Sequence, residues 1–314
     1  MVKGQNTRRY LWTRGGALGD FILALPSLQE LARRGPVTAV VPRRYLPLLQ
    51  GYPVEVREEE HPAWARLYQG GEQAPLPFDV AVVLRSDGEG ALREGLRSAG
   101  VGEVWYVDSQ QVDDPALHVI WHLLRGVGVT GEGDPPAPRL FLREDEREEA
   151  RRLLASRGME TDRMILLQPG SGGQAKRWPE PLWRELGECL QQRGFELLLS
   201  LGPVEWDEGE GERWRQGPWR LIPPLGLREQ AALQSLGVVV GCDSGTTHLA
   251  AAVGARVVAL FGPTDPRRWR PAGPQVRVVQ APGVNMASLP VAYTLAAVLE
   301  VSRAPRPQLH LGVA

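Results

Sequence analysis

Short apolar runs alternate with longer helical patterns, and this alternation constrains the fold more than any other feature of the chain. In the first half, helical patterns cover residues 20–34, 62–69, 89–98 and 115–126. Such alternation is typical of a parallel sheet that is covered by helices on both faces. We therefore expect a Rossmann-like α/β domain here, with strands in the runs YLWTR, VTAVV, VEVRE, DVAVVLR and EVWYV.

The second half repeats this theme. Its predicted strands are the runs MILLQP, FELLLSL, GVVVGCD, VVALFGP and VRVVQA, and the predicted helices cover 144–157, 181–193, 227–236, 246–253 and 288–302. A second Rossmann-like domain is therefore expected. By analogy with folds of this kind, the last helix can pack back on the first domain.

The segment TGEGDPPAPR, residues 130–139, separates the two halves and reads as an interdomain linker because of its prolines and glycines. Leu140 to Leu142 is either one more strand or part of this connection. We predict two domains, 1–139 and 140–314, whose parallel sheets face a central cleft. In open α/β sheets, ligands bind beyond the carboxyl ends of the strands, so the chemistry is expected in those loops.

Composition excludes several classes of function. The chain has 314 residues, a formal net charge of -1 and 43% hydrophobic residues, as in an ordinary soluble globular protein. This charge gives no general attraction to nucleic acid or to an anionic membrane. The first residues are too polar for a signal peptide, and no run approaches the roughly 18 apolar residues of a membrane span. A cytoplasmic location is expected.

The cysteines and histidines do not indicate a metal site. Cys189 and Cys242 lie far apart in apolar contexts, which favours small buried side chains over reactive thiols. His118 and His122 are four residues apart but lack the HExxH pattern, so helix residues without a metal are favoured. We expect neither a metal nor a cofactor.

The loop GGALGD places a single acid, Asp20, at the start of an apolar helix. It matches neither the P-loop nor GxGxxG, and the second strand is followed by Arg43 and Arg44 instead of an acid for a ribose. Two interpretations of Asp20 stay open at this point. It can cap the helix or favour its positive end, or it can accept a proton in catalysis.

The loop QPGSGGQAKRWPEPLW, 168–183, has the features of a diphosphate site. Small residues let backbone N–H groups approach an anion, and Pro179 and Pro181 suit the start of a helix. Lys176 supplies a mobile positive charge, and the only other lysine is Lys3. The alternative is a glycine-rich surface turn with a solvated lysine, which the scarcity of lysine disfavours.

Two further loops follow later strands. In GCDSGTTHLAAAVG, 241–254, Asp243 ends a strand and a helix of small residues begins, so its first N–H groups can hold phosphate oxygens. In LFGPTDPRRWRP, 260–271, a rigid turn carries arginines and is either a ligand loop or a solvated basic turn. The acidic run 204–213 reads mostly as solvated loop, with Glu205 the acid closest to the strand end.

These loops, in this order, resemble glycosyltransferase family nine, the ADP-heptose:lipopolysaccharide heptosyltransferases. The resemblance extends from about residue 10 to 303 and rests on GALGDFILALPSL, PGSGGQAKRWP, LGPVE, DSGTTHLAAAVG and LFGPTDP. It implies the GT-B fold, with two Rossmann-like domains. It also implies inverting, metal-independent transfer of a sugar, heptose by the family name, from an ADP-sugar to a hydroxyl of a lipopolysaccharide-core or other cell-surface glycan.

Carried over by motif, the resemblance implies that Asp20 is the general base and Lys176 the catalytic ligand of the donor phosphates. Gly19 and Arg85 are expected on the acceptor side. We further expect a monomer that has no affinity for nucleic acid and that can contact the inner membrane face peripherally. The expected donor-binding residues are Ser171, Lys176, Glu205, Asp243, Ser244, Gly245 and His248.

Two other functions are compatible with the same two-domain plan. A nucleotide-sugar epimerase or phosphorylase-like enzyme would need its own acid/base pair, and beyond Asp20 the sequence offers no convincing member of one. A nucleotide-binding module without catalysis is disfavoured because both Asp20 and Lys176 are present.

Overall fold

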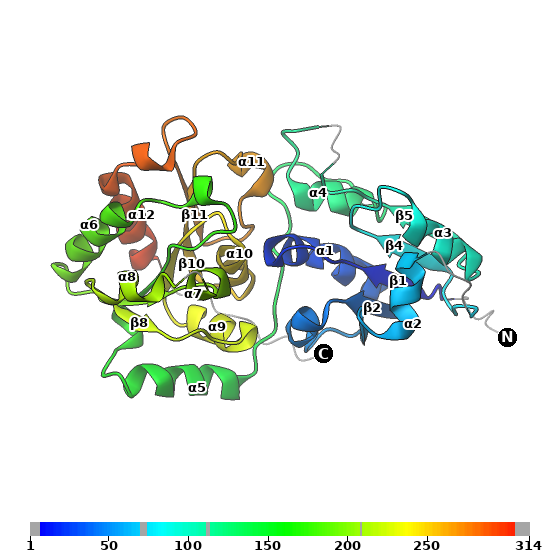
Figure 1. Ribbon diagram of the computed structural model, residues 1–314, viewed down its shortest axis with the longest axis horizontal. Helices are drawn as coiled ribbons and strands as arrows, with labels where there is room; N and C mark the ends of the chain where they lie inside the picture. The colour runs from blue at the N-terminus through cyan, green and yellow to red at the C-terminus, as the bar shows by residue number, and fades with distance from the viewer. Residues whose placement is uncertain (1–6, 70–73, 111–113, 208, 305–314) are drawn as a thin grey trace. The chain divides into compact units, whose positions relative to one another are not determined.

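The computed structural model describes residues 7–69, 74–110, 114–207 and 209–304. The chain divides into two compact units, Met1–Phe141 (unit 1) and Leu142–Ala314 (unit 2), which are considered separately below (Figure 1). This division falls just after the predicted linker 130–139. Each unit is built on one parallel sheet, so the predicted α/β class is confirmed.

Unit 1 has a five-stranded sheet in the order β3-β2-β1-β4-β5, and its neighbouring strands all run parallel. The strands are β1 (Tyr10–Thr13), β2 (Val37–Val41), β3 (Glu55–Glu58), β4 (Val80–Val83) and β5 (Glu103–Tyr106). The helices are α1 (Leu18–Arg34), η1 (Arg43–Leu49), α2 (Pro62–Ala65), η2 (Arg66–Gln69), α3 (Ala91–Ser98) and α4 (Val119–Arg125).

Unit 2 has a six-stranded parallel sheet in the order β11-β10-β9-β6-β7-β8. Its strands are β6 (Met164–Gln168), β7 (Glu196–Ser200), β8 (Arg220–Ile222), β9 (Val238–Cys242), β10 (Arg256–Phe261) and β11 (Val276–Gln280). Its helices are α5 (Glu144–Ala155), η3 (Thr161–Arg163), η4 (Gln174–Lys176), α6 (Glu180–Gln191), α7 (Pro203–Asp207), α8 (Gly211–Arg215), α9 (Leu227–Gln234), α10 (Gly245–Ala252), α11 (Pro266–Trp269), η5 (Met286–Ser288) and α12 (Val291–Arg303).

The central strands are buried on both faces because helices cover both sides of each sheet. Every residue of β1, β2, β4, β6, β9 and β10 is buried, which explains the nearly continuous apolar runs in the sequence. Trp12 on β1 is fully buried, and its indole N–H donates to Ser27 Oγ on α1 at 3.0 Å. This contact locks the first helix onto the strand that precedes it.

The strand orders locate the ligand-binding edges. The connections change direction between β1 and β4 in unit 1 and between β6 and β9 in unit 2. A crevice opens at such a switch point because the two connecting loops leave on opposite faces of the sheet. Arg85 follows β4 in unit 1, and the loops after β6 and β9 carry Lys176 and Asp243 in unit 2. The predicted site residues therefore lie at the edges that open α/β folds use.

Several local expectations were wrong. The acidic run 204–213 is not mostly solvated loop: it contributes to the short helices α7 and α8 and carries the buried Glu205, and the buried Trp214 follows directly. The edge strand β8 was not predicted at all. Of the two alternatives for Leu140 to Leu142, the connection is confirmed, because this segment forms no strand. Helix α12 packs on α6 and on β9, β10 and β11 of its own unit, and packing on the first domain stays a prediction.

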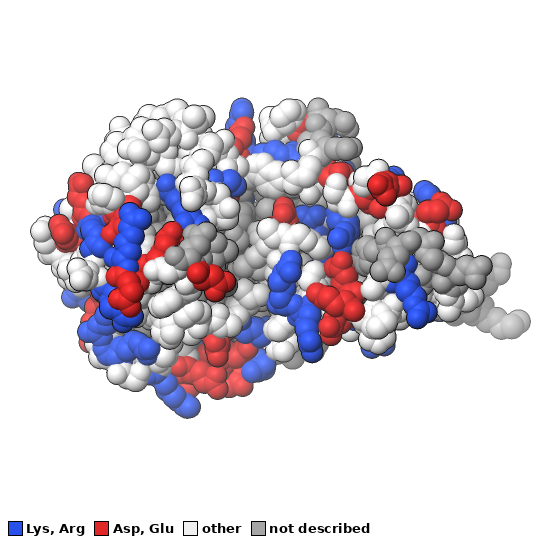
Figure 2. Space-filling model, in the orientation of Figure 1, with Lys and Arg blue, Asp and Glu red and all other residues white. Residues whose placement is uncertain are grey.

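Charges of both signs are interspersed over the visible face of the molecule (Figure 2). This distribution agrees with a net charge near zero and gives no single-sign surface on that face. None of the helices in the described ranges combines the length and the apolar character that a membrane span requires.

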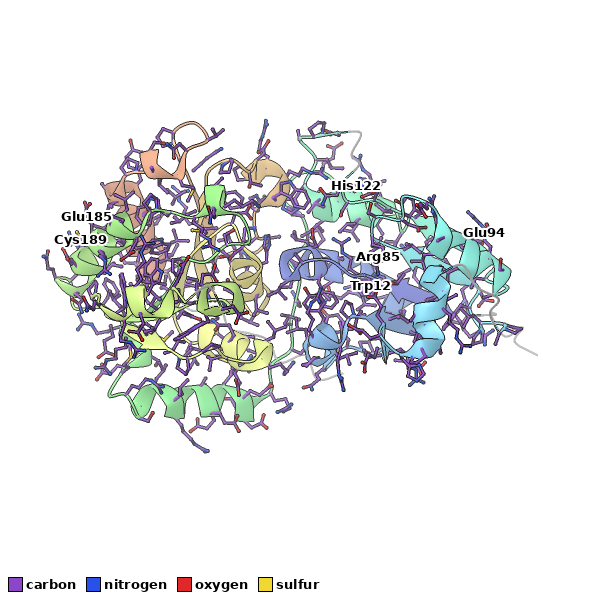
Figure 3. The ribbon with its side chains drawn as sticks, viewed as in Figure 1. Trp12, Arg85, Glu94, His122, Glu185 and Cys189 are labelled. Atoms are coloured by element: carbon purple, nitrogen blue, oxygen red, sulfur yellow. The ribbon has the colours of Figure 1, made fainter. Side chains whose placement is uncertain are left out.

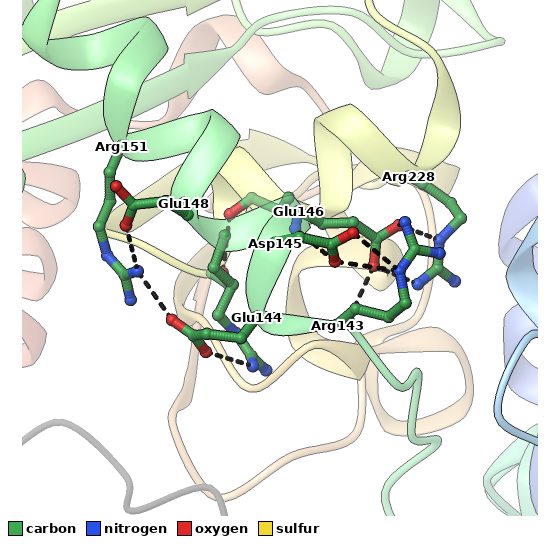
Figure 4. Close-up of polar contacts among 10 residues, drawn as sticks. Arg143, Glu144, Asp145, Glu146, Glu148, Arg151 and Arg228 are labelled. Carbon is green, nitrogen blue, oxygen red and sulfur yellow. Dashed lines mark hydrogen bonds and ion pairs between the residues drawn. The ribbon is translucent and has the colours of Figure 1, made fainter.

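A group of ion pairs anchors α5, the first helix of unit 2, to α9 (Figure 4). The Arg228 guanidinium on α9 donates to both carboxylate oxygens of Glu146, and both side chains are almost buried. Glu146 also accepts from the backbone N–H of Arg143 at 2.8 Å. The helix that follows the connection is therefore held by a bidentate contact to the body of unit 2.

Glu146→Gln should lower the free energy of unfolding by about 2 kcal/mol near neutral pH, because Arg228 loses its charged partner in a nearly buried position. Burial raises the pKa of Glu146, but the hydrogen bonds from Arg228 and from the Arg143 N–H outweigh it and hold the pKa below its ordinary value of 4.5. Because the folded pKa is the lower one, this stabilisation is present above the ordinary value and is lost as the pH falls through the folded value.

Urea unfolding at about pH 7 and about pH 3 tests this pair, and the difference between wild type and Glu146→Gln should shrink at the lower pH. Glu148→Gln on the same helix is the matched control, because Glu148 pairs with Arg151 and Arg152 at the surface. Its effect should stay below about 1 kcal/mol. Equal effects of the two substitutions would contradict an anchoring role for Glu146.

Candidate active site

In unit 1, the chain leaves β1 through Arg14, Gly15 and Gly16 and enters α1. Ala17 is the N-cap of this helix and no side chain caps it, so Asp20 is not the capping residue. Asp20 lies in the first turn, where the helix dipole favours a negative charge. Its side chain is 26% exposed, so the carboxylate can be reached from solvent.

Arg14 contacts both the side chain and the backbone of Asp20. Its side chain is only 4% exposed, and its Nη2 lies 3.4 Å from Asp20 Oδ1. Its Nε donates to the backbone carbonyl of Asp20 at 3.2 Å, and its Nη1 donates to the carbonyl of Leu84 and lies 3.5 Å from Ser109 Oγ. One buried guanidinium thus joins the start of α1 to the residues that follow β4 and β5.

A second arginine lies at the same edge. Arg85 follows β4 and pairs with Glu59, and its position in unit 1 is labelled in Figure 3. A side chain at Gly15 would place its Cβ 3.1 Å from Arg85 Nη1, so the glycine permits this close approach. Arg44 donates to the carbonyl of Gly16 at 2.9 Å. Gly19, the other predicted acceptor residue, is partly exposed in the first turn of α1.

These groups surround a cavity of about 360 Å³ that is lined by Gly15, Gly16, Arg44, Glu59 and Arg85, among others. Arginines and glutamates both line it, so an anionic or hydroxylated ligand would meet hydrogen-bond donors and acceptors together. Arg43 does not line this cavity; its Nε lies 3.7 Å from Glu58 Oε1 instead.

In unit 2, Lys176 and Asp243 meet at the switch point. Lys176 Nζ donates to Asp243 Oδ2 at 2.7 Å; Lys176 is 38% exposed, whereas Asp243 is 8% exposed. Ser171 Oγ donates to the Asp243 carbonyl at 2.8 Å, and His248 Nε2 lies 4.0 Å from Asp243 Oδ1. The loops after β6 and β9 are therefore joined by an ion pair whose cationic end faces solvent.

Trp178, two residues after Lys176, fixes the position of this loop. Trp178 is buried, its indole N–H donates to the Leu289 carbonyl at 3.1 Å, and its ring packs edge-on against Trp183 at 5.1 Å. Its backbone N–H also approaches Cys242 Sγ at 3.4 Å. Because Trp178 is held by three contacts, the preceding Lys176 is presented from a rigid base.

Helix α10 begins directly after Asp243, with Ser244 as its N-cap and Gly245 as its first residue. The Ser244 side chain makes no cap hydrogen bond and instead lies 3.0 Å from Thr246 Oγ1 and 3.1 Å from Thr247 Oγ1. The first N–H groups of any α-helix lack intrahelical partners and carry a partial positive charge. This end therefore suits phosphate oxygens.

Arg177 connects this loop to Glu205. Its Nη2 lies 3.1 Å from Glu205 Oε1, its Nη1 lies 3.0 Å from Glu210 Oε1, and its Nε donates to the Ser171 carbonyl at 3.0 Å. Glu205 is 5% exposed, and a Cβ at Gly170 would lie 2.7 Å from its carboxylate. These residues border a cavity of about 310 Å³ that also includes Trp178 and Trp214.

The cysteines and the histidines His118 and His122 are placed as structural residues. Burial raises the pKa of Cys242 to about 12, so it is not a reactive thiol, and Cys189 lies on α6 (Figure 3). His118 caps α4 by accepting from the Ile120 N–H, and His122 Nε2 lies 2.9 Å from the Asp108 carbonyl. Among the residues that the structure describes, no three His, Cys, Asp or Glu side chains gather as a metal site.

The loop LFGPTDPRRWRP, residues 260–271, is not simply a solvated basic turn. Asp265 caps the short helix α11 and pairs with Arg267, whereas Arg268 is buried and lies over the Trp269 ring at 4.9 Å. The hydrogen bond and charge of Arg267 hold the pKa of Asp265 below its ordinary value. This loop is held together by its own contacts.

The structure thus brings Ser171, Lys176, Asp243 and His248 together within unit 2 and connects them through Arg177 to Glu205. In unit 1 it places Asp20 beside Arg14 and Arg85 near Gly15. Sequence reasoning missed Arg14 and Arg177. Both lie next to a glycine-rich loop, but arginine is so frequent in this chain that neither position stands out.

Comparisons with known proteins show the family and the fold of the chain. The model of glycosyltransferase family 9 (heptosyltransferase) matches residues 77–290. Lipopolysaccharide heptosyltransferase 1 of Pseudomonas aeruginosa is 26% identical over 286 residues, which are 82% of this chain and 79% of that protein.

Solved structures share the fold. A family 9 glycosyltransferase from Veillonella parvula superposes with a TM-score of 0.74 at 17% identity, covering 94% of this chain and 97% of that one. ADP-heptose lipopolysaccharide heptosyltransferase II of E. coli gives 0.72 at 20% identity, covering 94% and 98%. The two Rossmann-like units are thus those of the GT-B class. The chain belongs to glycosyltransferase family 9 and is a heptosyltransferase-like enzyme.

Proposed function

We propose that the enzyme transfers heptose from ADP-heptose to a hydroxyl of the lipopolysaccharide core or of another cell-surface glycan, with inversion and without a metal ion. The observation that carries this proposal is the Lys176–Asp243 ion pair at the β6/β9 switch point, beside the start of α10. An ammonium group and a helix N-terminus are groups that can stabilise a leaving diphosphate. The names of the relatives, which are lipopolysaccharide heptosyltransferases, support the donor and acceptor classes.

In the proposed donor site, Lys176 and the first N–H groups of α10 hold the diphosphate. Asp243, which pairs with Lys176, aims it and limits its motion. We assign His248, beside Asp243, and Ser244, the N-cap of α10, to phosphate or sugar oxygens. Glu205 accepts a hydrogen bond from a hydroxyl of the donor's ribose, which lies in the cavity that Glu205 borders. Fixed donors of this kind contribute roughly 3 kcal/mol each when charge develops on a leaving group.

In the proposed reaction, Asp20 accepts the proton of the acceptor hydroxyl as the oxygen forms a bond to the anomeric carbon. The bond from that carbon to the diphosphate breaks, and ADP departs with the electron pair. Inversion requires the attacking and leaving oxygens on opposite sides of the anomeric carbon. We assign the base to unit 1 and the leaving-group contacts to unit 2, and we assign Gly19 and Arg85 to the acceptor.

Lys176 and the helix terminus supply the positive charge that a divalent cation supplies in other phosphate chemistry, and the proposal is therefore metal-independent. The proposal also treats the enzyme as a cytoplasmic monomer that meets a lipid-borne acceptor at the inner membrane face. Transfer should continue at full rate in excess EDTA, and loss of activity that Mg²⁺ restores would contradict this part.

Thermal unfolding with a panel of nucleotides tests the donor class. ADP-heptose and ADP should raise the melting temperature, by linkage, more than UDP-sugars at the same concentration. Transfer is then measured as ADP release with heptose-deficient lipopolysaccharide as acceptor. Protection by UDP-sugars alone, or by no nucleotide, would contradict the proposed donor.

Gly170→Ala should weaken the binding of both ADP and adenosine about tenfold, because the new Cβ would lie 2.7 Å from the Glu205 carboxylate and displace it. Gly172→Ala in the same loop is the matched control, since a Cβ there meets nothing within 4 Å. Calorimetric titration with ADP and with adenosine measures both variants. Equal affinities of Gly170→Ala and wild type for both ligands would contradict the assignment of Glu205 to the ribose.

A further inference from the structure

Arg14 is the most deeply buried charge near the proposed base. It directly follows β1, and its guanidinium contacts the Asp20 carboxylate and the Asp20 carbonyl at 3.4 and 3.2 Å. The same group donates to the Leu84 carbonyl after β4 and lies 3.5 Å from Ser109 Oγ after β5. Asp20 is therefore tied to the ends of three neighbouring strands through one planar side chain.

Stability alone does not explain this arrangement. Burying an ion pair costs about as much desolvation energy as its attraction returns, so apolar residues of the same size often serve stability equally well. Burial lowers the pKa of Arg14, and the charge of Asp20 is the largest influence that raises it. Because an arginine guanidinium does not lose its proton in proteins, a buried cation here meets a partly exposed carboxylate.

We propose that Arg14 is the positioning residue of the general base: it holds the Asp20 carboxylate in one orientation, with Oδ1 bound and Oδ2 directed to the side of Gly16. Oδ2 would lie 3.4 Å from a Cβ at Gly16, so the glycine leaves the space beside it open. This inference rests on the proposed role of Asp20. The planar fork of arginine suits the task because it holds the carboxylate and a backbone carbonyl together, whereas lysine is a single point charge.

Other titratable groups near Arg14 have hydrogen-bond or ion-pair partners of their own. Arg85 pairs with Glu59, and Asp108 accepts from Ser86 Oγ at 3.1 Å and from the Gln110 N–H at 2.9 Å. Tyr45 donates its hydroxyl to the Gly16 carbonyl at 2.9 Å. Among these groups, Asp20 is the carboxylate with an ion pair to Arg14.

A double-mutant cycle on the full-length enzyme tests the proposal. Arg14→Met should lower kcat for heptose transfer by about 10- to 100-fold, with KM for ADP-heptose within about twofold of wild type, because only the base is misplaced. In the Asp20→Asn background, Arg14→Met should change the residual rate by less than about threefold, since a residue that acts through Asp20 has nothing left to position. Arg14→Lys should recover part of the loss.

The control for loss of a buried arginine is Arg256→Met in unit 2, where Arg256 donates to the Ser302 carbonyl at 3.0 Å. It should lower stability with little change in kcat at a temperature where all variants are folded. If Arg14→Met does not fold, Arg14→Lys replaces it in the cycle, with a smaller loss that again disappears in Asp20→Asn. Equal losses in both backgrounds, or no loss, would overturn the proposal for Arg14 alone. Full activity of Asp20→Asn would instead overturn the proposed base, and Arg14 with it.

Discussion

Asp20→Asn should lower kcat for heptose transfer by about 10²- to 10⁴-fold, the range for removal of a general base. The substituted amide is nearly the same size but cannot take the acceptor proton. Because the proposed donor contacts lie in the other unit, affinity for ADP should be unchanged. A structural role would give a different result: losing the Asp20 charge at the start of α1 and beside the buried Arg14 would cost about 1–3 kcal/mol of stability, with kcat largely unchanged.

The control for Asp20→Asn is Glu30→Gln on the same helix. Glu30 pairs with Arg33 and Arg34 in the last turns of α1. Its substitution should leave kcat within about twofold and lower stability by less than about 1 kcal/mol. Stopped-time assays of ADP release, together with titration of ADP, separate the two variants. A rate for Asp20→Asn close to that of Glu30→Gln would show that Asp20 is not the base.

Lys176→Met should weaken ADP binding by about 10²-fold and lower kcat by a similar factor. The first effect follows from the loss of a charged hydrogen bond to the diphosphate, and the second from the loss of its stabilisation as charge develops on the leaving group. The variant also leaves Asp243, which is 8% exposed, without its cation and close to the phosphates. Affinity for adenosine, which has no phosphate, should hardly change.

The control for Lys176→Met is Arg152→Met, which removes one cation of unit 2 from the exposed face of α5. Titrations of ADP and adenosine at two salt concentrations should show a smaller salt dependence for ADP in Lys176→Met only. Equal weakening of ADP and adenosine would mean that Lys176 supports the shape of the loop and does not bind the diphosphate.

Periodicity predicted the layered fold because buried parallel strands and amphipathic helices leave strong signals. It missed β8, Arg220 to Ile222, since a three-residue edge strand with an exposed arginine has no clear pattern. It also misread the acidic run 204–213. Asp207, Glu212 and Arg213 are exposed on two short helices, whereas Glu205 is buried. The signal for packing was Trp214, just beyond the run.

Of the candidate site, too, one part could be predicted from the sequence and another part could not. Lys176 could be singled out because lysine is nearly absent from this chain, and Asp20 because an acid opens an apolar helix. The ion pairs of Arg14 with Asp20 and of Arg177 with Glu205 depend on which loops meet at a sheet edge. That information lies in the strand order, and no local pattern distinguishes a buried arginine from the many on the surface.

The configuration of the product is the most direct test of the account. Wild type and Asp20→Asn are incubated with ADP-heptose and heptose-deficient lipopolysaccharide in EDTA, and the transferred sugar is examined by NMR spectroscopy. We expect the wild-type product to carry one added heptose whose anomeric configuration is opposite to that in the donor, and Asp20→Asn to form almost none. Retained configuration, or equal product from both proteins, would contradict a single displacement assisted by Asp20.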